Sequence, residues 1–334
     1  MNLFQQPVFT IIMDTYNRPA LLREALNAIV NQTYEKLEII FVNNGGTKET
    51  VEILHEIAAK DQRIKLVHFQ ENQYSPEDPT KMVYTCLNAA LKIAQGDYVW
   101  YQSDDDVLSQ DYAEKMVKLF EHNSECITAA GLPVSVDFKG NILDLQPRTH
   151  NFRPRYMPGH LLTLDYFRGG LMFTAPGTIF TIKREVLLKA GGYHRAVELS
   201  HMVGIVPFGI TGFDETALFY WRRHEAQLNK HLNANGHIGI KETLALLEDW
   251  DIKQRLSKFG EPVALEILST IKKQLCREAA HWFALNLYSL RFRSALRIFH
   301  DIWLLFFFWT KMPFFLWKHK RTLGHHLKQL LQLH

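Results

Sequence analysis

The first 130 residues alternate short apolar segments with amphipathic ones, and this order limits the folds available to the chain. Apolar runs rich in β-branched residues predict strands at Val8–Met13, Leu37–Val42, Lys65–Phe69 and Asp97–Gln102. Apolar residues at helical spacing predict helices that start at Pro19, after Thr47 and at Thr80, and one over Ser109–His122. A βαβαβαβ order implies an α/β fold: a Rossmann-like, mostly parallel sheet flanked by helices.

The rest of the chain is less regular and then becomes helical. The segments Cys126–Val136 and Gly177–Ile182 resemble strands, and Arg184–Lys189 resembles a short helix that Gly191 and Gly192 stop. From about Gly239 the pattern is helical almost throughout. We therefore expect an α/β domain over residues 1–235 and a helical C-terminal extension over residues 236–334.

Polar segments follow three of the predicted strands, at Thr15–Arg18, Asn43–Gly46 and Ser103–Asp106. In open α/β sheets, ligands bind outside the carboxyl ends of the strands. We expect these three segments to lie along one crevice, which would be the binding site.

Three adjacent carboxylates, Asp104, Asp105 and Asp106, end the fourth predicted strand. Like charges raise each other's pKa, and a hard divalent cation such as Mg²⁺ or Mn²⁺ is the usual resolution. The alternative is a solvated turn that starts a helix, since Asp is favoured at helix caps. The convergence of polar segments at the same edge favours the metal site.

The net charge limits the possible binding partners, and the cysteine content indicates the cellular compartment. A net charge of only +3 over 334 residues argues against broad nucleic-acid binding. The three cysteines have no CxxC spacing, which fits buried thiols in a reducing compartment. The N-terminal residues lack a signal-peptide pattern, so we expect a cytoplasmic protein.

Five sequence blocks carry a resemblance to a known family. Thr10–Pro19, Glu38–Thr47 and Gly96–Leu108 resemble the nucleotide-sugar domain of family 2 glycosyltransferases, which have the GT-A fold. Gly177–Tyr193 and Tyr220–Asn229 resemble the acceptor-side and closing segments of that family. The match covers roughly residues 7–230. It implies an inverting transferase that moves a sugar from a nucleotide-diphosphate donor, with a UDP-sugar expected, to a hydroxyl group.

The resemblance implies a set of donor-binding residues. Thr15 and Tyr16 fall where the family contacts the base and ribose, and Asp104 falls next to the ribose. Asn44 falls where a uracil-binding Asp is usual, and its amide could still pair with a uracil imide. Arg18 and Lys81 are candidates for the diphosphate, although both could equally be solvated side chains near helix starts.

The same resemblance implies the metal site. Asp105 falls at the metal-binding acid of the family's DxD motif, whose first acid is replaced by Ser103. Asp106 is expected to support it. His224 falls near the metal or the diphosphate in many members, and its alternative role is structural, in the turn Arg222–Glu225.

The general base is expected just after the Gly-Gly-Tyr turn, where Glu198 is the carboxylate present. It would take the proton from the acceptor hydroxyl. Asp214 is the rival, and either could instead be a surface carboxylate. His201 could assist or be structural.

Aromatic and basic residues crowd the C-terminal region, with a dense apolar run over Ile302–Trp317 and the basic group Lys318–Arg321. Aromatic helices with basic flanks bind the interface of anionic membranes. This predicts a peripheral protein on the inner face of the cell membrane. A helical subdomain that packs on the core or forms a dimer is the alternative.

The leading hypothesis is thus a transferase acting on a glycan or lipid-linked acceptor in surface polysaccharide synthesis. A nucleotidyltransferase would also use a parallel sheet and acidic metal ligands, but normally carries a Gly-rich basic loop after the first strand. The third hypothesis is a membrane-bound scaffold with this fold and little or no turnover, which the Asn44 and Ser103 replacements keep open.

Overall fold

The computed structural model describes residues 6–75, 78, 80–144, 154–168, 180–194, 197–224, 247–248, 250–289, 291–302, 312–314 and 316–317. The chain clusters into two compact units, one of residues 1–163 and 171–225 and the other of residues 164–170 and 226–334. The boundary expected after residue 235 falls outside the described residues.

Within the described residues, ten strands form one sheet in the order β3-β2-β1-β4-β9-β6-β10-β5, with β7 beside β6 and β8 beside β10. The strands are β1 (Phe9–Thr15), β2 (Leu37–Asn44), β3 (Ile64–Phe69), β4 (Tyr98–Ser103), β5 (Val107–Leu108), β6 (Cys126–Val136), β7 (Ile142–Asp144), β8 (Tyr156–Pro158), β9 (Thr181–Lys183) and β10 (Ile210–Arg222). The four strands expected first along the chain are confirmed, as is the strand over residues 126–136.

The first four strands are parallel, as expected, and their carboxyl ends are in register. Thr15 at the end of β1 pairs with Asn43 of β2, and Asp14 pairs with Ser103 of β4. The three polar segments therefore do follow neighbouring strands at one edge of the sheet. The sheet as a whole is mixed, because β9 runs antiparallel to both β4 and β6, and β5, β7 and β8 are also antiparallel to their neighbours.

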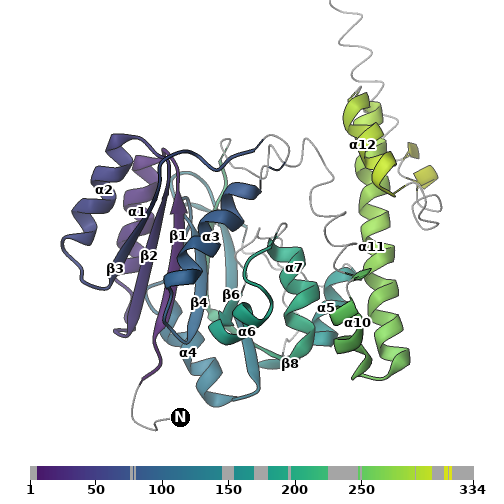
Figure 1. Ribbon diagram of the computed structural model, residues 1–334, viewed down its shortest axis with the longest axis horizontal. Helices are drawn as coiled ribbons and strands as arrows, with labels where there is room; N and C mark the ends of the chain where they lie inside the picture. The colour runs from purple at the N-terminus through teal and green to yellow at the C-terminus, as the bar shows by residue number, and fades with distance from the viewer. Residues whose placement is uncertain are drawn as a thin grey trace, which may run out of the picture. The chain divides into compact units, whose positions relative to one another are not determined.

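Helices cover both faces of the sheet. They are α1 (Pro19–Val30), α2 (Lys48–Ala58), α3 (Lys81–Ile93), α4 (Tyr112–His122), α5 (Gly159–Phe167), α6 (Arg184–Lys189) and α7 (Val197–Gly204), with a 3₁₀ turn at Val206–Phe208. Side chains of α1, α2 and α4 share one buried core with alternate residues of β1, namely Phe9, Ile11 and Met13. Helix α3 contacts β1 and β2 from the other face, in front of the strands in Figure 1.

The second unit contains α10 (Trp250–Ser257), α11 (Glu261–Tyr288) and α12 (Phe292–Ile302), in agreement with the helical pattern expected from residue 239. Helices α11 and α12 pack on each other (Figure 1). In the part of the chain that the structure describes, no helix is long and apolar enough to cross a membrane. The aromatic run over residues 303–310 and the basic group over residues 318–321 lie outside the described residues.

Candidate active site

The three aspartates between β4 and β5 are buried. Asp104, Asp105 and Asp106 are 4%, 7% and 4% exposed. A solvated turn would leave such side chains in water, so that alternative is wrong. Buried carboxylates need positive charge or hydrogen-bond donors around them, and the structure supplies both.

Thr15 and Arg18, from the end of β1 and the loop after it, both contact the cluster. The Thr15 hydroxyl donates to Asp104 Oδ2 at 2.8 Å. Arg18 Nη1 lies 3.0 Å from Asp104 Oδ1 and 2.9 Å from Asp105 Oδ2. Burial raises the pKa of Asp104, while the Arg18 charge opposes this shift and Asp105 adds to it. The first loop therefore binds both acids at once.

His224, just beyond the end of β10, also contacts the Asp105 carboxylate. Its Nε2 lies 3.0 Å from Asp105 Oδ2, and its side chain is 8% exposed. Burial pushes the pKa of Asp105 upward, but the hydrogen bond from His224 and the charge of Arg18 hold it below its usual value. Asp105 is thus the acid on which Arg18 and His224 meet, and it stays ionised.

Asp106 faces a different partner. Its Oδ1 accepts a hydrogen bond from the backbone amide of Arg222 at 3.0 Å, and the Arg222 side chain pairs with Glu24 of α1. Burial and the charge of Asp105 raise the pKa of Asp106 well above its usual value. These contacts tie Asp106, just before β5, to the end of β10.

Asn44 is fully buried and holds a neighbouring loop. Its Oδ1 accepts from the Gln73 amide at 2.9 Å, and its Nδ2 donates to Asn72 Oδ1 at 3.3 Å. Two exposed aromatic side chains near Asn44 are those of Tyr16, 41% exposed, and Tyr74, 50% exposed. Asn44 therefore shapes the loop that contains Tyr74, with its own amide group already engaged.

Lys81 and Glu198 lie on helix starts. Lys81 is the exposed first residue of α3, and Glu198 lies half-buried in the first turn of α7. The turn before α7 is fixed to α3, because Asn88 donates to the Tyr193 carbonyl at 2.7 Å and accepts from its amide at 2.9 Å. Gly191 in this turn has φ of +85°, a conformation that favours glycine.

His201 has a structural environment. It is 4% exposed, and its ring lies 5.6 Å from the ring of Tyr193. Burial lowers the pKa of His201 to about 3. A neutral imidazole packed on a tyrosine fits the structural role rather than proton transfer.

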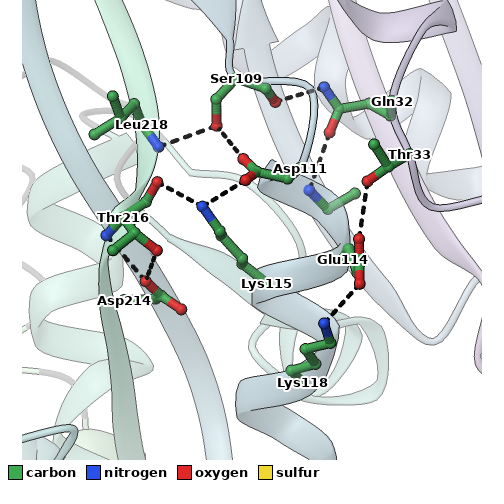
Figure 2. Close-up of polar contacts among 11 residues, drawn as sticks. Gln32, Thr33, Ser109, Asp111, Glu114, Lys115, Lys118, Asp214, Thr216 and Leu218 are labelled. Atoms are coloured by element: carbon green, nitrogen blue, oxygen red, sulfur yellow. Dashed lines mark hydrogen bonds and ion pairs between the residues drawn. The ribbon is translucent and has the colours of Figure 1, made fainter.

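Asp214 is not brought to the cluster. Its Oδ1 accepts from the amide and hydroxyl of Thr216 at 2.9 and 2.6 Å, in a bulge of β10 beside Lys115 of α4 (Figure 2). Arg222, whose amide contacts Asp106, is eight residues further along the strand. At about 3.3 Å per residue, that separation is on the order of 20 Å even with the bulge. Asp214 thus stabilises its own turn.

Two residues at this edge were not predicted from the sequence. Burial of Asp14, with the charge of Asp104 adding to the effect, raises its pKa to about 7. An acid inside the otherwise apolar strand β1 was the available signal. The ring of Phe138, which is 58% exposed, lies 6.5 Å from the His224 ring. No sequence pattern indicated that the turn after β6 would reach His224.

Comparisons with known proteins agree with this geometry. The family model described as "Glycosyl transferase family 2" matches residues 10–190. An uncharacterized glycosyltransferase of Haemophilus influenzae is 32% identical over 139 residues, which are 42% of this chain and 52% of that protein. The chain therefore matches about half the length of this relative.

Two solved structures share the fold. The crystal structure of Staphylococcus aureus TarS 1-349 in complex with UDP-GlcNAc has a TM-score of 0.56 at 12% identity, covering 87% of this chain and 89% of that one. The structure of mannosyltransferase PcManGT from Pyrobaculum calidifontis, in complex with GDP-Man and Mn²⁺, has a TM-score of 0.53 at 19% identity. The match covers 94% of this chain and 86% of that one. The fold is that of GT-A glycosyltransferases. The family model matches more than half of the chain, so the chain belongs to glycosyltransferase family 2.

Proposed function

We propose that this protein transfers a sugar from a nucleotide-diphosphate donor to a hydroxyl group of a glycan or lipid-linked acceptor, with a UDP-sugar as the expected donor. The observation that carries the proposal is the meeting of Thr15, Arg18 and His224 on Asp104 and Asp105 at the carboxyl edge of the sheet. Such an edge is where α/β sheets bind nucleotides.

The donor side of the site is proposed to lie along Thr15, Tyr16 and the loop held by Asn44. The half-exposed rings of Tyr16 and Tyr74 offer flat apolar surfaces on which a base can stack. Asp104, held by Thr15, is proposed to face the ribose. Arg18, with Lys81 as an exposed second cation, is proposed to bind the diphosphate.

A divalent cation, Mg²⁺ or Mn²⁺, fits the residues present. Two buried carboxylates side by side need positive charge, and Asp105 Oδ2 and His224 Nε2 already face each other at 3.0 Å. Among the described residues, no three Asp, Glu, His or Cys side chains converge closely enough to hold a metal alone. Asp105 and His224 would therefore hold the ion, with the donor phosphates and water as its other ligands. When bound, such an ion neutralises the charge that develops on the leaving diphosphate.

Glu198 is proposed as the general base. It would take the proton from the acceptor hydroxyl while that oxygen bonds to the anomeric carbon and the bond to the diphosphate breaks. A single displacement of this kind inverts the anomeric configuration. The place of Glu198 in the first turn of α7, shortly after the turn that Asn88 of α3 holds through the Tyr193 backbone, supports this role.

The C-terminal helices are proposed to attach the protein to the inner face of an anionic membrane. Phe292 and Leu296, one turn apart on α12, are 54% and 65% exposed, and Trp317 is 64% exposed. Exposed Arg291 and Arg293 lie on either side of Phe292 in the sequence. Apolar side chains beside arginines are the pattern of helices that lie in a membrane interface. A lipid-linked acceptor would be presented at the same surface.

A donor panel tests the proposal. The purified protein is incubated with UDP- and GDP-sugars, with and without Mn²⁺, and both the melting temperature and the release of nucleoside diphosphate are measured. We expect one donor to raise the melting temperature in the presence of Mn²⁺ and to be turned over. Binding without turnover on any glycan or lipid acceptor would favour the inactive scaffold. Release of pyrophosphate from a nucleoside triphosphate and a sugar phosphate would favour a nucleotidyltransferase.

A further inference from the structure

Asp105 is already neutralised by a side chain of the protein itself. Arg18 Nη1 bridges the two acids, at 3.0 Å from Asp104 Oδ1 and 2.9 Å from Asp105 Oδ2. The side chains of Asp104 and Asp105 are 5% and 8% exposed, whereas that of Arg18 is 28% exposed. Of these three groups, Arg18 is thus the outer one, on the solvent side of the pair.

The backbone that carries Arg18 is held firmly. Asn17 has φ of +52°, in the left-handed region, and its side-chain oxygen accepts from the Thr47 amide at 2.6 Å. Pro19 begins α1 directly afterwards and restricts the backbone further. A change at Arg18 therefore falls on its long side chain, which can move while the loop stays in place.

We propose that Arg18 takes the place of the divalent cation at Asp105 in the free enzyme and moves onto the diphosphate when the donor binds. This inference rests on the proposed function. Arg18 donates to the same oxygen, Asp105 Oδ2, that the cation would use, and two positive charges on one oxygen repel each other. A guanidinium binds phosphate as readily as carboxylate, so the donor offers Arg18 a partner of the same kind.

Donor and cation binding are then linked through Arg18. The diphosphate draws Arg18 off Asp105, and the released carboxylate becomes available to the cation. By thermodynamic reciprocity, the cation must strengthen donor binding by the same factor. Arg18 acts as a positioning residue in this scheme: it prevents a cation from occupying the site before the donor arrives.

Titration with Mn²⁺ alone tests this role, with Arg18→Gln and the apolar Arg18→Met as variants. Arg23→Gln is the matched control, since Arg23 lies in α1, which begins just after Arg18, but is 59% exposed and pairs with Glu56 at 3.4 Å. Mn²⁺ affinity is measured calorimetrically without nucleotide and then with UDP. Without nucleotide, we expect both Arg18 variants to bind Mn²⁺ on the order of tenfold more tightly than wild type, a typical size for linkage between two sites. With UDP, the gain in Mn²⁺ affinity should shrink in the variants, and Arg23→Gln should match wild type in both conditions.

Equal or weaker Mn²⁺ binding by both variants without nucleotide would overturn the inference, as would an unchanged effect of UDP. A second measurement uses only the wild-type protein: its crystal structure with UDP and Mn²⁺. There we expect Arg18 to have left Asp105 Oδ2 for the diphosphate; if it keeps both carboxylate contacts, the inference fails. Because the first titration needs no donor, it decides the role of Arg18 even if no nucleotide sugar is turned over.

Discussion

Replacing Asp105 by Asn separates the proposed catalytic role of this carboxylate from its effect on stability. The substitution keeps the shape of the side chain and removes one negative charge from the buried pair. In the wild-type protein, Oδ2 of Asp105 accepts from Arg18 at 2.9 Å and lies 3.0 Å from His224 Nε2. The variant thus loses the charge that contacts Arg18 and His224 and that would bind the proposed cation.

Two opposing electrostatic effects decide the stability of the Asp105→Asn variant. Loss of charge weakens two charge-assisted hydrogen bonds by about 1–1.5 kcal/mol each. Relief of repulsion from Asp104 returns roughly 3 kcal/mol, taking a separation of about 6 Å and an effective dielectric constant of about 20. These terms nearly cancel, so the melting temperature should change by less than about 5 °C.

The rate of sugar transfer, in contrast to the stability, should change strongly in Asp105→Asn. Lewis-acid stabilisation of the leaving diphosphate is worth several kcal/mol, and each ~1.4 kcal/mol is tenfold in rate. Asp105→Asn should therefore lower the rate of sugar transfer by about 10²–10³-fold. The matched control is Asp111→Asn, because this carboxylate contacts Lys115 and Ser109, at the start of α4, rather than Arg18 or His224 (Figure 2). Transfer within about threefold of wild type in Asp105→Asn would refute this reasoning.

Other substitutions test separate parts of the molecule. Glu198→Gln should lower the rate of sugar transfer by at least about 100-fold without weakening donor binding in a thermal-shift assay. Asp214→Asn should retain transfer. The reverse pattern would make Asp214 the general base. Glu38→Ala should destabilise the protein by about 2–5 kcal/mol in urea unfolding, because the 7% exposed carboxylate accepts from the Thr10 hydroxyl and two backbone amides. Burial raises the pKa of Glu38, but Lys65, Thr10 and those amides hold it below its usual value of 4.5. The stabilisation is therefore complete above that usual value and is lost as the pH falls through the lowered folded-state pKa. An equal loss of stability at pH 7 and pH 3 would contradict this. Phe292→Ser combined with Leu296→Ser should abolish sedimentation with anionic liposomes, and unchanged sedimentation would contradict membrane attachment by α12.

The longer helices and strands were predictable because their apolar residues recur at clear helical or strand spacing. Strand β6 lies at Cys126–Val136, as the apolar pattern indicated, and α1 begins at Pro19 as expected. Strands β5, β7 and β8 have only two or three residues, too few for a period to be recognised. Strand β9, at Thr181–Lys183, overlaps the strand expected at Gly177–Ile182. Strand β10 was missed because Asp214 and Glu215 interrupt its apolar pattern at the bulge.

The candidate site was predictable in place but not in detail. Parallel strands put Thr15, Asn43 and Ser103 at one edge by topology alone. The directions of individual side chains depend on tertiary contacts that no local pattern contains. Asn44 turns toward the Gln73 amide, and Asp106 turns toward the amide of Arg222, which is 116 residues away in the chain.

The most direct test of the account is to locate the cation in a crystal of the wild-type protein grown with a nucleoside diphosphate and Mn²⁺. Anomalous scattering at the manganese edge identifies the ion without assumptions about its ligands. We predict a peak within about 2.3 Å of an Asp105 carboxylate oxygen, with the diphosphate also bound to the ion and His224 beside it. A peak at another site, or a nucleotide bound away from the ends of β1, β2 and β4, would contradict it.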